Sequence, residues 1–117
     1  MSSNKNSPAK AVIRRLLEVG YTGNHRLVDE LVDDTYVDHG FWRNKGKLLQ
    51  TLTALCAAYP SLACNVEEII GEGDTVAAFY GLTATSRSEQ KSIHAVGLFR
   101  LRDGKVVEHW GFSDSFF

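Results

Sequence analysis

The residues best suited to chemistry lie near the end of the chain, where acidic side chains alternate with large aromatic ones. In the segment 108–114 (EHWGFSD), a strand repeat of two places the following side chains on one face: Glu108, Trp110, Phe112 and Asp114. A carboxylate beside large aromatic rings is poorly solvated, which raises its pKa and suits it to acid/base catalysis near neutral pH. Asp114 is therefore a candidate catalytic residue. The alternative is a solvated carboxylate at a fraying strand end.

A second candidate cluster is Tyr36-Val37-Asp38-His39. His39 is suited to proton transfer because the unperturbed pKa of histidine is about 6.5. Asp38, its neighbour in sequence, orients it only if the backbone there is irregular. A hydrogen-bonded structural histidine in a loop is the alternative. We also expect His94, in the middle of a strand with a mixed face, to point into a cavity.

Other chemistries and partners are disfavoured by the sequence. A metal site needs three or four convergent ligands, and the chain has no His-x-x-x-His or Cys-x-x-Cys spacing, so neither a metal nor a cofactor is expected. The net charge of −1 argues against nucleic-acid binding. No apolar run approaches the roughly 20 residues that cross a bilayer, and the polar N-terminus does not resemble a signal peptide. We expect a soluble, cytoplasmic protein without membrane contact.

The apolar pattern changes along the chain from helical to strand-like. We expect a disordered tail over residues 1–7 and a single domain over 8–117. Helices are expected from Pro8, over a short stretch that Asp33-Asp34 closes, and over Lys47–Tyr59, with an irregular connection at 35–46. Strands are expected near 62–71, 74–86, 92–102 and 105–114. Helices followed by an antiparallel meander define an α+β class.

The central strands carry apolar residues on both faces. In 92–102, one face holds Phe99 among other apolar residues, and the other includes Val96 and Leu98. The helices can cover only one face of a sheet, so the other face is expected to meet a second copy of the chain. The sequence therefore predicts a homodimer through the sheet, and leaves open which face lines a pocket.

Four short motifs, in order, resemble those of the SnoaL-like polyketide cyclases. These motifs are 21–24 (YTGN), 36–39 (YVDH), 58–62 (AYPSL) and 99–110 (FRLRDGKVVEHW). The resemblance covers about residues 10–114. It implies a nuclear transport factor 2-like fold, with a curved antiparallel sheet of four to five strands wrapped around three N-terminal helices to form a cone or barrel. It also implies an apolar pocket, a homodimer, and an acid/base role for the aspartate at the position of Asp114, with His39 near the pocket.

Two functions remain open from the sequence. The first is a small cofactor-free enzyme of cyclase, isomerase or hydrolase type that uses Asp114 and His39 on an apolar small molecule. The second is a binding module of the same fold without turnover, in which Asp114 only orients the ligand. In either case the aromatic candidates for the pocket are Trp42, Tyr80, Phe99, Trp110 and Phe112.

Overall fold

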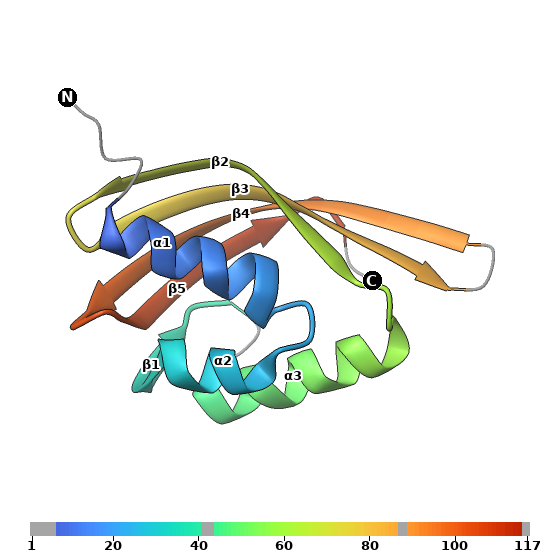
Figure 1. Ribbon diagram of the computed structural model, residues 1–117, viewed down its shortest axis with the longest axis horizontal. Coiled ribbons are helices and arrows are strands. Elements are labelled where there is room, and N and C mark those ends of the chain that lie inside the picture. The colour runs from blue at the N-terminus through green and yellow to red at the C-terminus, as the bar shows by residue number, and fades with distance from the viewer. Residues whose placement is uncertain (1–6, 41–43, 87–88, 116–117) are drawn as a thin grey trace.

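The computed structural model describes residues 7–40, 44–86 and 89–115. Its elements follow in the order α1 (Pro8–Arg15), η2 (Leu16–Gly20), α2 (His25–Leu31), β1 (Val32–Asp38), α3 (Lys45–Ala58), β2 (Ala63–Glu72), β3 (Thr75–Ser86), β4 (Glu89–Arg102) and β5 (Lys105–Ser113). Here η2 is a short π-helix that continues α1. Apart from Ser7, the predicted tail lies outside the described residues. The predicted order of helices first and long strands afterwards is confirmed (Figure 1).

The five strands form one open, mixed sheet in the order β1-β5-β4-β3-β2. Strands β2 to β5 make the predicted antiparallel meander, whereas β1 pairs with β5 in the parallel direction. The predicted α+β class, with three helices and a curved sheet of four to five strands, is confirmed. In detail the sheet is mixed instead of purely antiparallel, and it is an open cone and not a closed barrel. The extra strand arises where Asp33-Asp34 was expected to end a helix: α2 stops at Leu31 and the chain continues directly into β1.

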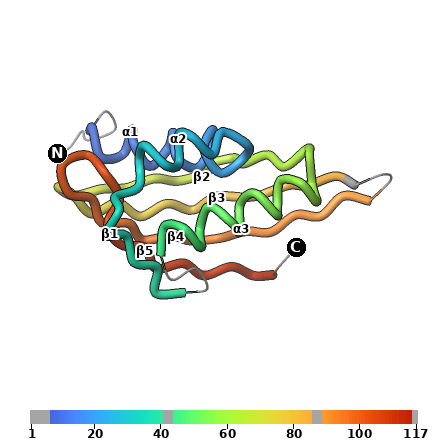
Figure 2. The backbone as a smooth tube through the Cα atoms, turned by 90° about the horizontal axis from the view of Figure 1, so that it is seen from below, coloured from blue at the N-terminus to red at the C-terminus, as the bar shows by residue number. Residues whose placement is uncertain are grey.

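All the helices lie against one face of the sheet (Figures 1 and 2). The α1 helix contacts β2 and β3, while α3 contacts α2 and β1. No helix or strand among the described residues covers the opposite face, which we call the outer face. The face under the helices is the inner face, and it carries both the core and the cavity described below.

Local sequence explains where the helices begin and how the tightest turns form. The side chains of Ser7, Asn24 and Asn44 accept hydrogen bonds from backbone N–H groups in the first turns of α1, α2 and α3. At the predicted Asp-Gly hairpin between β4 and β5, Asp103 and Gly104 have φ of 52° and 79°. These left-handed conformations match the turn that favours a two-residue hairpin.

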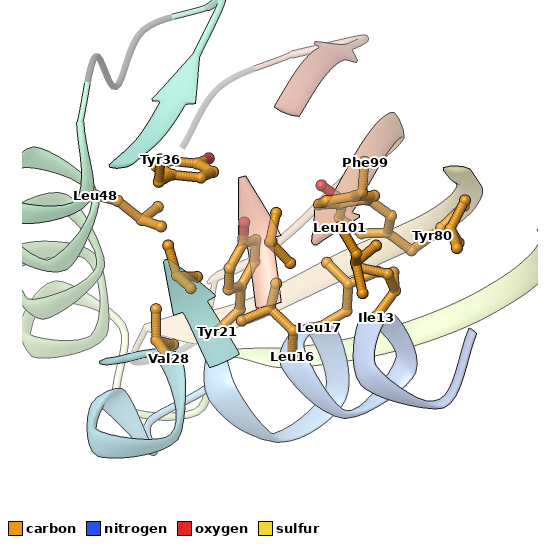
Figure 3. Close-up of a cluster of buried hydrophobic side chains, with 14 of the residues drawn as sticks. Ile13, Leu16, Leu17, Tyr21, Val28, Tyr36, Leu48, Tyr80, Phe99 and Leu101 are labelled. Carbon is orange, nitrogen blue, oxygen red and sulfur yellow. The ribbon is translucent and has the colours of Figure 1, made fainter. Parts of the chain in front are cut away.

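The core joins α1 and η2 to the inner face of the sheet. Ile13, Leu17 and Phe99 are completely buried and lie together in the cluster of Figure 3. Burying one such side chain stabilises the fold by roughly 1.5–3 kcal/mol. Gly20 permits close packing in this region, because a Cβ there would lie 2.9 Å from Cγ2 of Val28.

No helix of the described residues is long and apolar enough to cross a membrane.

Candidate active site

A cavity of about 390 Å³ lies between α3 and the inner face of the sheet. Most of its wall is apolar, with Leu55 from α3, Leu82 from β3, and Ile93 and Ala95 from β4. The polar part of the wall lies at the β1–β5 side. The remaining lining residues are Asp38, Gly40, Thr51, Tyr80, His109, Gly111, Phe112, Ser113 and Ser115.

A buried aspartate–histidine pair forms the polar end of this cavity. Nδ1 of His109 lies 3.0 Å from Oδ2 of Asp38, and the two side chains are only 3% and 1% exposed. The parallel pairing of β1 with β5 brings the two residues together, since Asp38 and His109 are register partners. The parallel β1–β5 pairing therefore positions this pair.

Asp38 is held by two further hydrogen bonds. The Tyr36 hydroxyl donates to Oδ2 over 3.1 Å, and the Gly40 N–H donates to Oδ1 over 2.7 Å. Burial by itself would raise the pKa of Asp38, but the hydrogen bonds from His109, Gly40 and Tyr36 outweigh it and lower the pKa. Asp38 is therefore ionised at neutral pH and acts only as an acceptor.

The ionised Asp38 determines the proton position on neutral His109. Because a carboxylate can only accept, Nδ1 of His109 must carry the hydrogen and donate it. Nε2 of the neutral ring then holds an unprotonated lone pair. This Nε2 is buried and has no hydrogen-bond partner among the described residues, although its residue lines the cavity. A buried nitrogen that lacks a hydrogen-bond partner is suited to accept a hydrogen bond or a proton from a ligand.

Two glycines and a phenylalanine fix the position of the His109 ring. Gly97 and Gly111 are cross-strand partners on β4 and β5, and a Cβ on either would lie 3.0 Å from Nε2 of His109. On one side the imidazole stacks on Phe99, with ring centroids 4.5 Å apart. The ring therefore occupies space that only glycine leaves free.

Asp114, the predicted catalytic residue, lies outside this cavity wall. Its Oδ1 accepts a hydrogen bond of 2.9 Å from the His94 backbone N–H, and its Oδ2 lies 3.7 Å from Nδ1 of His94. The Asp114 side chain is 59% exposed, so the expected dry environment is not found. His94 is also half-exposed and lies 3.4 Å from Glu67, away from the cavity. The acid/base role of Asp114 stays a prediction.

His39 and Trp110 lie together on the outer face. Their rings stack with centroids 4.4 Å apart, and Nε2 of His39 lies 3.3 Å from Oε2 of Glu108. Trp110 and Glu108 flank the inward-pointing His109 and so project to the opposite side of β5. The predicted common face of Glu108, Trp110 and Phe112 is thus real, but it is the face without helices.

The remaining predicted pocket residues divide among several places. Tyr80 and Phe112 line the cavity, and their role in substrate binding stays a prediction. Phe99 is completely buried and supports the His109 ring instead of forming the wall. Trp42 lies outside the described residues. No group of three His, Cys, Asp or Glu side chains within the described ranges is arranged to hold a metal ion.

The sequence contained a usable indication of the buried pair. Asp38 and Tyr36 are two residues apart and share the buried face of β1, so a strand interpretation of 32–38 would have pointed Asp38 into the core. Asp33-Asp34 was instead predicted to end a helix and 35–46 to be an irregular connection, so no regular strand was expected at Asp38. His109 was not predicted as a site residue because the prediction rested on its aromatic neighbours, Trp110 and Phe112, which belong to the opposite face of β5.

The structure thus combines an open sheet, covered by helices on one face, with a buried aspartate–histidine pair beside a largely apolar cavity. The sequence model of the SnoaL-like polyketide cyclase family matches residues 10–116. The chain therefore belongs to this family, as its motifs suggested. No curated protein matches the chain.

Solved structures have the same fold. Wild-type IdmH from Streptomyces antibioticus, proposed to be a polyketide cyclase, is 25% identical with a TM-score of 0.82, covering 93% of this chain and 93% of IdmH. A protein from Jannaschia sp. CCS1, proposed to be a SnoaL-like polyketide cyclase, is 22% identical with a TM-score of 0.79, covering 97% and 90%. AclR from Streptomyces galilaeus, proposed to be a hydroxylase, is 23% identical with a TM-score of 0.80, covering 91% and 88%.

Proposed function

We propose that this protein is a small cofactor-free enzyme of cyclase or isomerase type, with His109 as its acid/base group. The observation that supports this proposal is the buried Nε2 of His109, which has no hydrogen-bond partner among the described residues in a residue that lines the cavity. Asp38 is a positioning residue in this proposal, because it fixes the tautomer and stabilises the imidazolium that forms.

The proposed reaction is proton transfer at a carbon next to a carbonyl group. Nε2 of His109 removes the proton, and the electron pair of the C–H bond moves into an enolate. In an isomerisation, the imidazolium returns the same proton to a different atom of the enolate. In a ring closure, the enolate carbon attacks a second carbonyl group of the same molecule, and the imidazolium protonates the resulting alkoxide. Both sequences regenerate neutral His109.

Tyr80 is the proposed donor to the developing oxyanion. Its phenol belongs to the cavity wall, within the buried cluster of Figure 3. Desolvation raises the pKa of Tyr80 above its ordinary value, so the phenol keeps its proton and can only donate to an enolate oxygen. Hydrogen-bond donors placed where negative charge develops are among the largest contributors to catalysis.

The cavity favours a compact and mainly apolar substrate. Its volume of about 390 Å³ lies in the lower part of the range of about 300–1,000 Å³ typical of small-molecule sites. The aliphatic wall of Leu55, Leu82 and Ile93 offers no partner for a charged substituent. A small diketone or keto ester fits this description better than a large polycyclic molecule.

The test is deuterium uptake at carbon. Wild-type protein is incubated in D₂O with a panel of apolar β-diketones and β-keto esters, and loss of the Cα–H signal is followed by proton NMR. We expect His109→Gln to slow the enzyme-dependent exchange by about 10²-fold or more, as is typical for loss of a general base. Tyr80→Phe should lower the rate while leaving the pH profile unchanged.

Asp114→Asn serves as the matched comparison, since the sequence favoured that residue. Retained exchange in Asp114→Asn with loss in His109→Gln supports the proposal. Loss in Asp114→Asn with retained activity in His109→Gln would overturn it in favour of Asp114. If no compound in the panel exchanges faster than in buffer but several perturb the NMR signals of cavity residues, the alternative of a binding module without turnover replaces the enzyme proposal.

A further inference from the structure

The parallel pairing of β1 with β5, which brings Asp38 beside His109, is short and interrupted. Within the described residues the two strands share three register pairs: Val32 with Val106, Val37 with Glu108, and Asp38 with His109. Between the first two pairs, β1 advances from 32 to 37 while β5 advances only from 106 to 108, so the register shifts there. The pairing at the start of β1 therefore does not fix the pairing at its end.

The buried pair depends on the register at the end of β1. Successive side chains of a strand point to opposite faces, so a slip of one residue turns every side chain to the other face of the sheet. Such a slip of β1 would turn Asp38 away from Nδ1 of His109. Because the register shifts upstream of Val37, the position of Asp38 has to be set by contacts close to it.

His39, the residue directly after β1, makes three contacts with β5. Its backbone N–H donates a hydrogen bond of 2.9 Å to the carbonyl oxygen of His109. Its ring stacks on that of Trp110, with centroids 4.4 Å and planes 7° apart, and its Nε2 lies 3.3 Å from Oε2 of Glu108. The side chain of His39 therefore contacts both sequence neighbours of His109, the residue that Asp38 must meet.

Arg100 on β4 holds the β5 side of this contact. Its guanidinium carbon Cζ lies 5.5 Å from the Trp110 ring centroid, and its Nη1 lies 3.8 Å from Oε1 of Glu108. Arg100 and Glu108 are also register partners in the antiparallel pairing of β4 with β5. The ring of His39 thus packs on side chains that two paired strands hold together. We call His39, Trp110, Glu108 and Arg100 the outer cluster.

The outer cluster and the buried pair lie on opposite faces at the same point of the sheet. Asp38 and His109 point inward, whereas the residues that follow them, His39 and Trp110, point outward. A slip that separates Asp38 from His109 would also remove His39 from Trp110. The contacts on the two faces therefore support the same register.

We propose that the stack of His39 on Trp110 is a positioning device, which sets the register of β1 on β5 and so holds Asp38 against Nδ1 of His109 from the other side of the sheet. His39 is a positioning residue in this proposal, because it acts through Asp38 and not on a substrate. The effect on catalysis rests on the proposed function, whereas the effect on the buried pair does not.

The test is His39→Ala in the full-length protein, followed by NMR without any substrate. The His39 side chain is 38% exposed, so its removal leaves the core intact. In wild type the Nδ1–H of His109 donates to Asp38, and the nitrogen-15 signals of the ring report that tautomer. In His39→Ala we expect signals of the Nε2–H tautomer to appear beside it. The Nδ1 proton should exchange with water about tenfold faster, because local opening controls such exchange.

His94→Ala is the matched control. His94 also lies on the outer face, stacks on Phe79 with centroids 5.6 Å apart and has its Nε2 3.4 Å from Glu67. These residues belong to strands that do not pair with β1, so the His109 signals of His94→Ala should match those of wild type. His39→Phe keeps a flat ring over Trp110 and should restore the wild-type signals.

Three outcomes overturn the proposal: unchanged His109 signals in His39→Ala, equal changes in His39→Ala and His94→Ala, or signals in His39→Phe that resemble those of His39→Ala. Should His39→Ala fail to fold, His39→Leu decides the same points, because it fills similar space without a flat ring.

A kinetic measurement separates this proposal from the proposed function. With a compound that exchanges deuterium, His39→Ala should lower kcat by about 10- to 10²-fold, as is typical of a misplaced catalytic group. KM should stay nearly unchanged, because His39 does not line the cavity. Altered His109 signals without turnover of any compound would support the positioning role and contradict the enzyme. Turnover with unaltered signals in His39→Ala would do the reverse.

Discussion

The position of the proton on the His109 ring and the stability of the fold both depend on one carboxylate, that of Asp38. It accepts hydrogen bonds from Tyr36, Gly40 and His109, and its folded-state pKa lies below the ordinary value. An acid with a lowered pKa stabilises the folded protein above its unfolded pKa of about 3.9. That contribution is lost as the pH falls through the folded-state pKa.

The first residue-scale prediction therefore concerns Asp38→Asn. The variant should lose about 2 kcal/mol of unfolding free energy at pH 7, because hydrogen bonds to a charged group contribute about 1.5–3 kcal/mol. The gap between wild type and variant should be constant above about pH 5 and shrink as the pH falls below about 4. Urea unfolding at a series of pH values measures this, with the exposed Asp114→Asn as control. A gap that is independent of pH would contradict the ionised state of Asp38.

Asp38→Asn also separates the positioning role from a purely structural one. An amide can donate to Nδ1 of His109, so the proton moves to Nε2 and the lone pair at the cavity disappears. The nitrogen-15 NMR signals of the imidazole distinguish the two tautomers directly. A folded Asp38→Asn protein that keeps the wild-type tautomer would show that Asp38 does not set the proton position.

At the scale of elements, paired glycines on β4 and β5 make room for the catalytic candidate. A Cβ at Gly111 would lie 2.7 Å from Cε1 of His109, a distance that requires the buried ring to move. We predict that Gly111→Ala destabilises the protein by about 1–3 kcal/mol, the range typical of overpacking, and shifts the His109 NMR signals. Gly81→Ala on β3 is the control, because a Cβ there meets only ordinary contacts of 3.6 Å or more. Equal effects of the two substitutions would refute the role of the glycine pair.

Most strands and helices followed from local patterns, whereas β1 did not. The alternation in 92–102 and the Asp-Gly turn at 103–104 are properties of adjacent residues, so they predicted β4, β5 and their hairpin. In β1, the partly exposed Asp33 and the exposed Asp34 lie at the start of a strand whose partner, β5, comes about 70 residues later (His109 pairs with Asp38). Such pairing is a tertiary interaction that local propensity does not contain.

The site was harder to predict than the fold for the same reason. Asp38 and His109 meet only through that long-range pairing, and whether His109 points inward depends on which face the helices cover. The sequence predicted two apolar faces correctly but assigned the chemistry to the face of Trp110. Tyr80 was predicted as a substrate-binding residue from its aromatic character; it lies on the cavity wall, and its contact with a substrate stays a prediction.

Considered as a whole, the molecule keeps an apolar cavity that a packed core would fill. Natural proteins commonly retain such destabilising features where function needs them. Filling the cavity should therefore raise the free energy of unfolding and abolish function. Ala78 and Ala95 both belong to the buried core, on neighbouring strands of the same face, but of the two Ala95 alone also lines the cavity. Replacing each alanine by leucine therefore compares a position beside the cavity with one that is already closely packed.

We predict that Ala95→Leu raises the unfolding free energy by about 1 kcal/mol and abolishes both ligand binding and deuterium exchange, because the new side chain occupies the space beside His109. Ala78→Leu should instead lower the unfolding free energy by about 1–3 kcal/mol through overpacking. Thermal unfolding of both variants, with the binding of a β-diketone followed by NMR, measures the two effects. If Ala95→Leu destabilises as much as Ala78→Leu, the cavity is not open to a side chain in solution, and a ligand of that size would not enter it either.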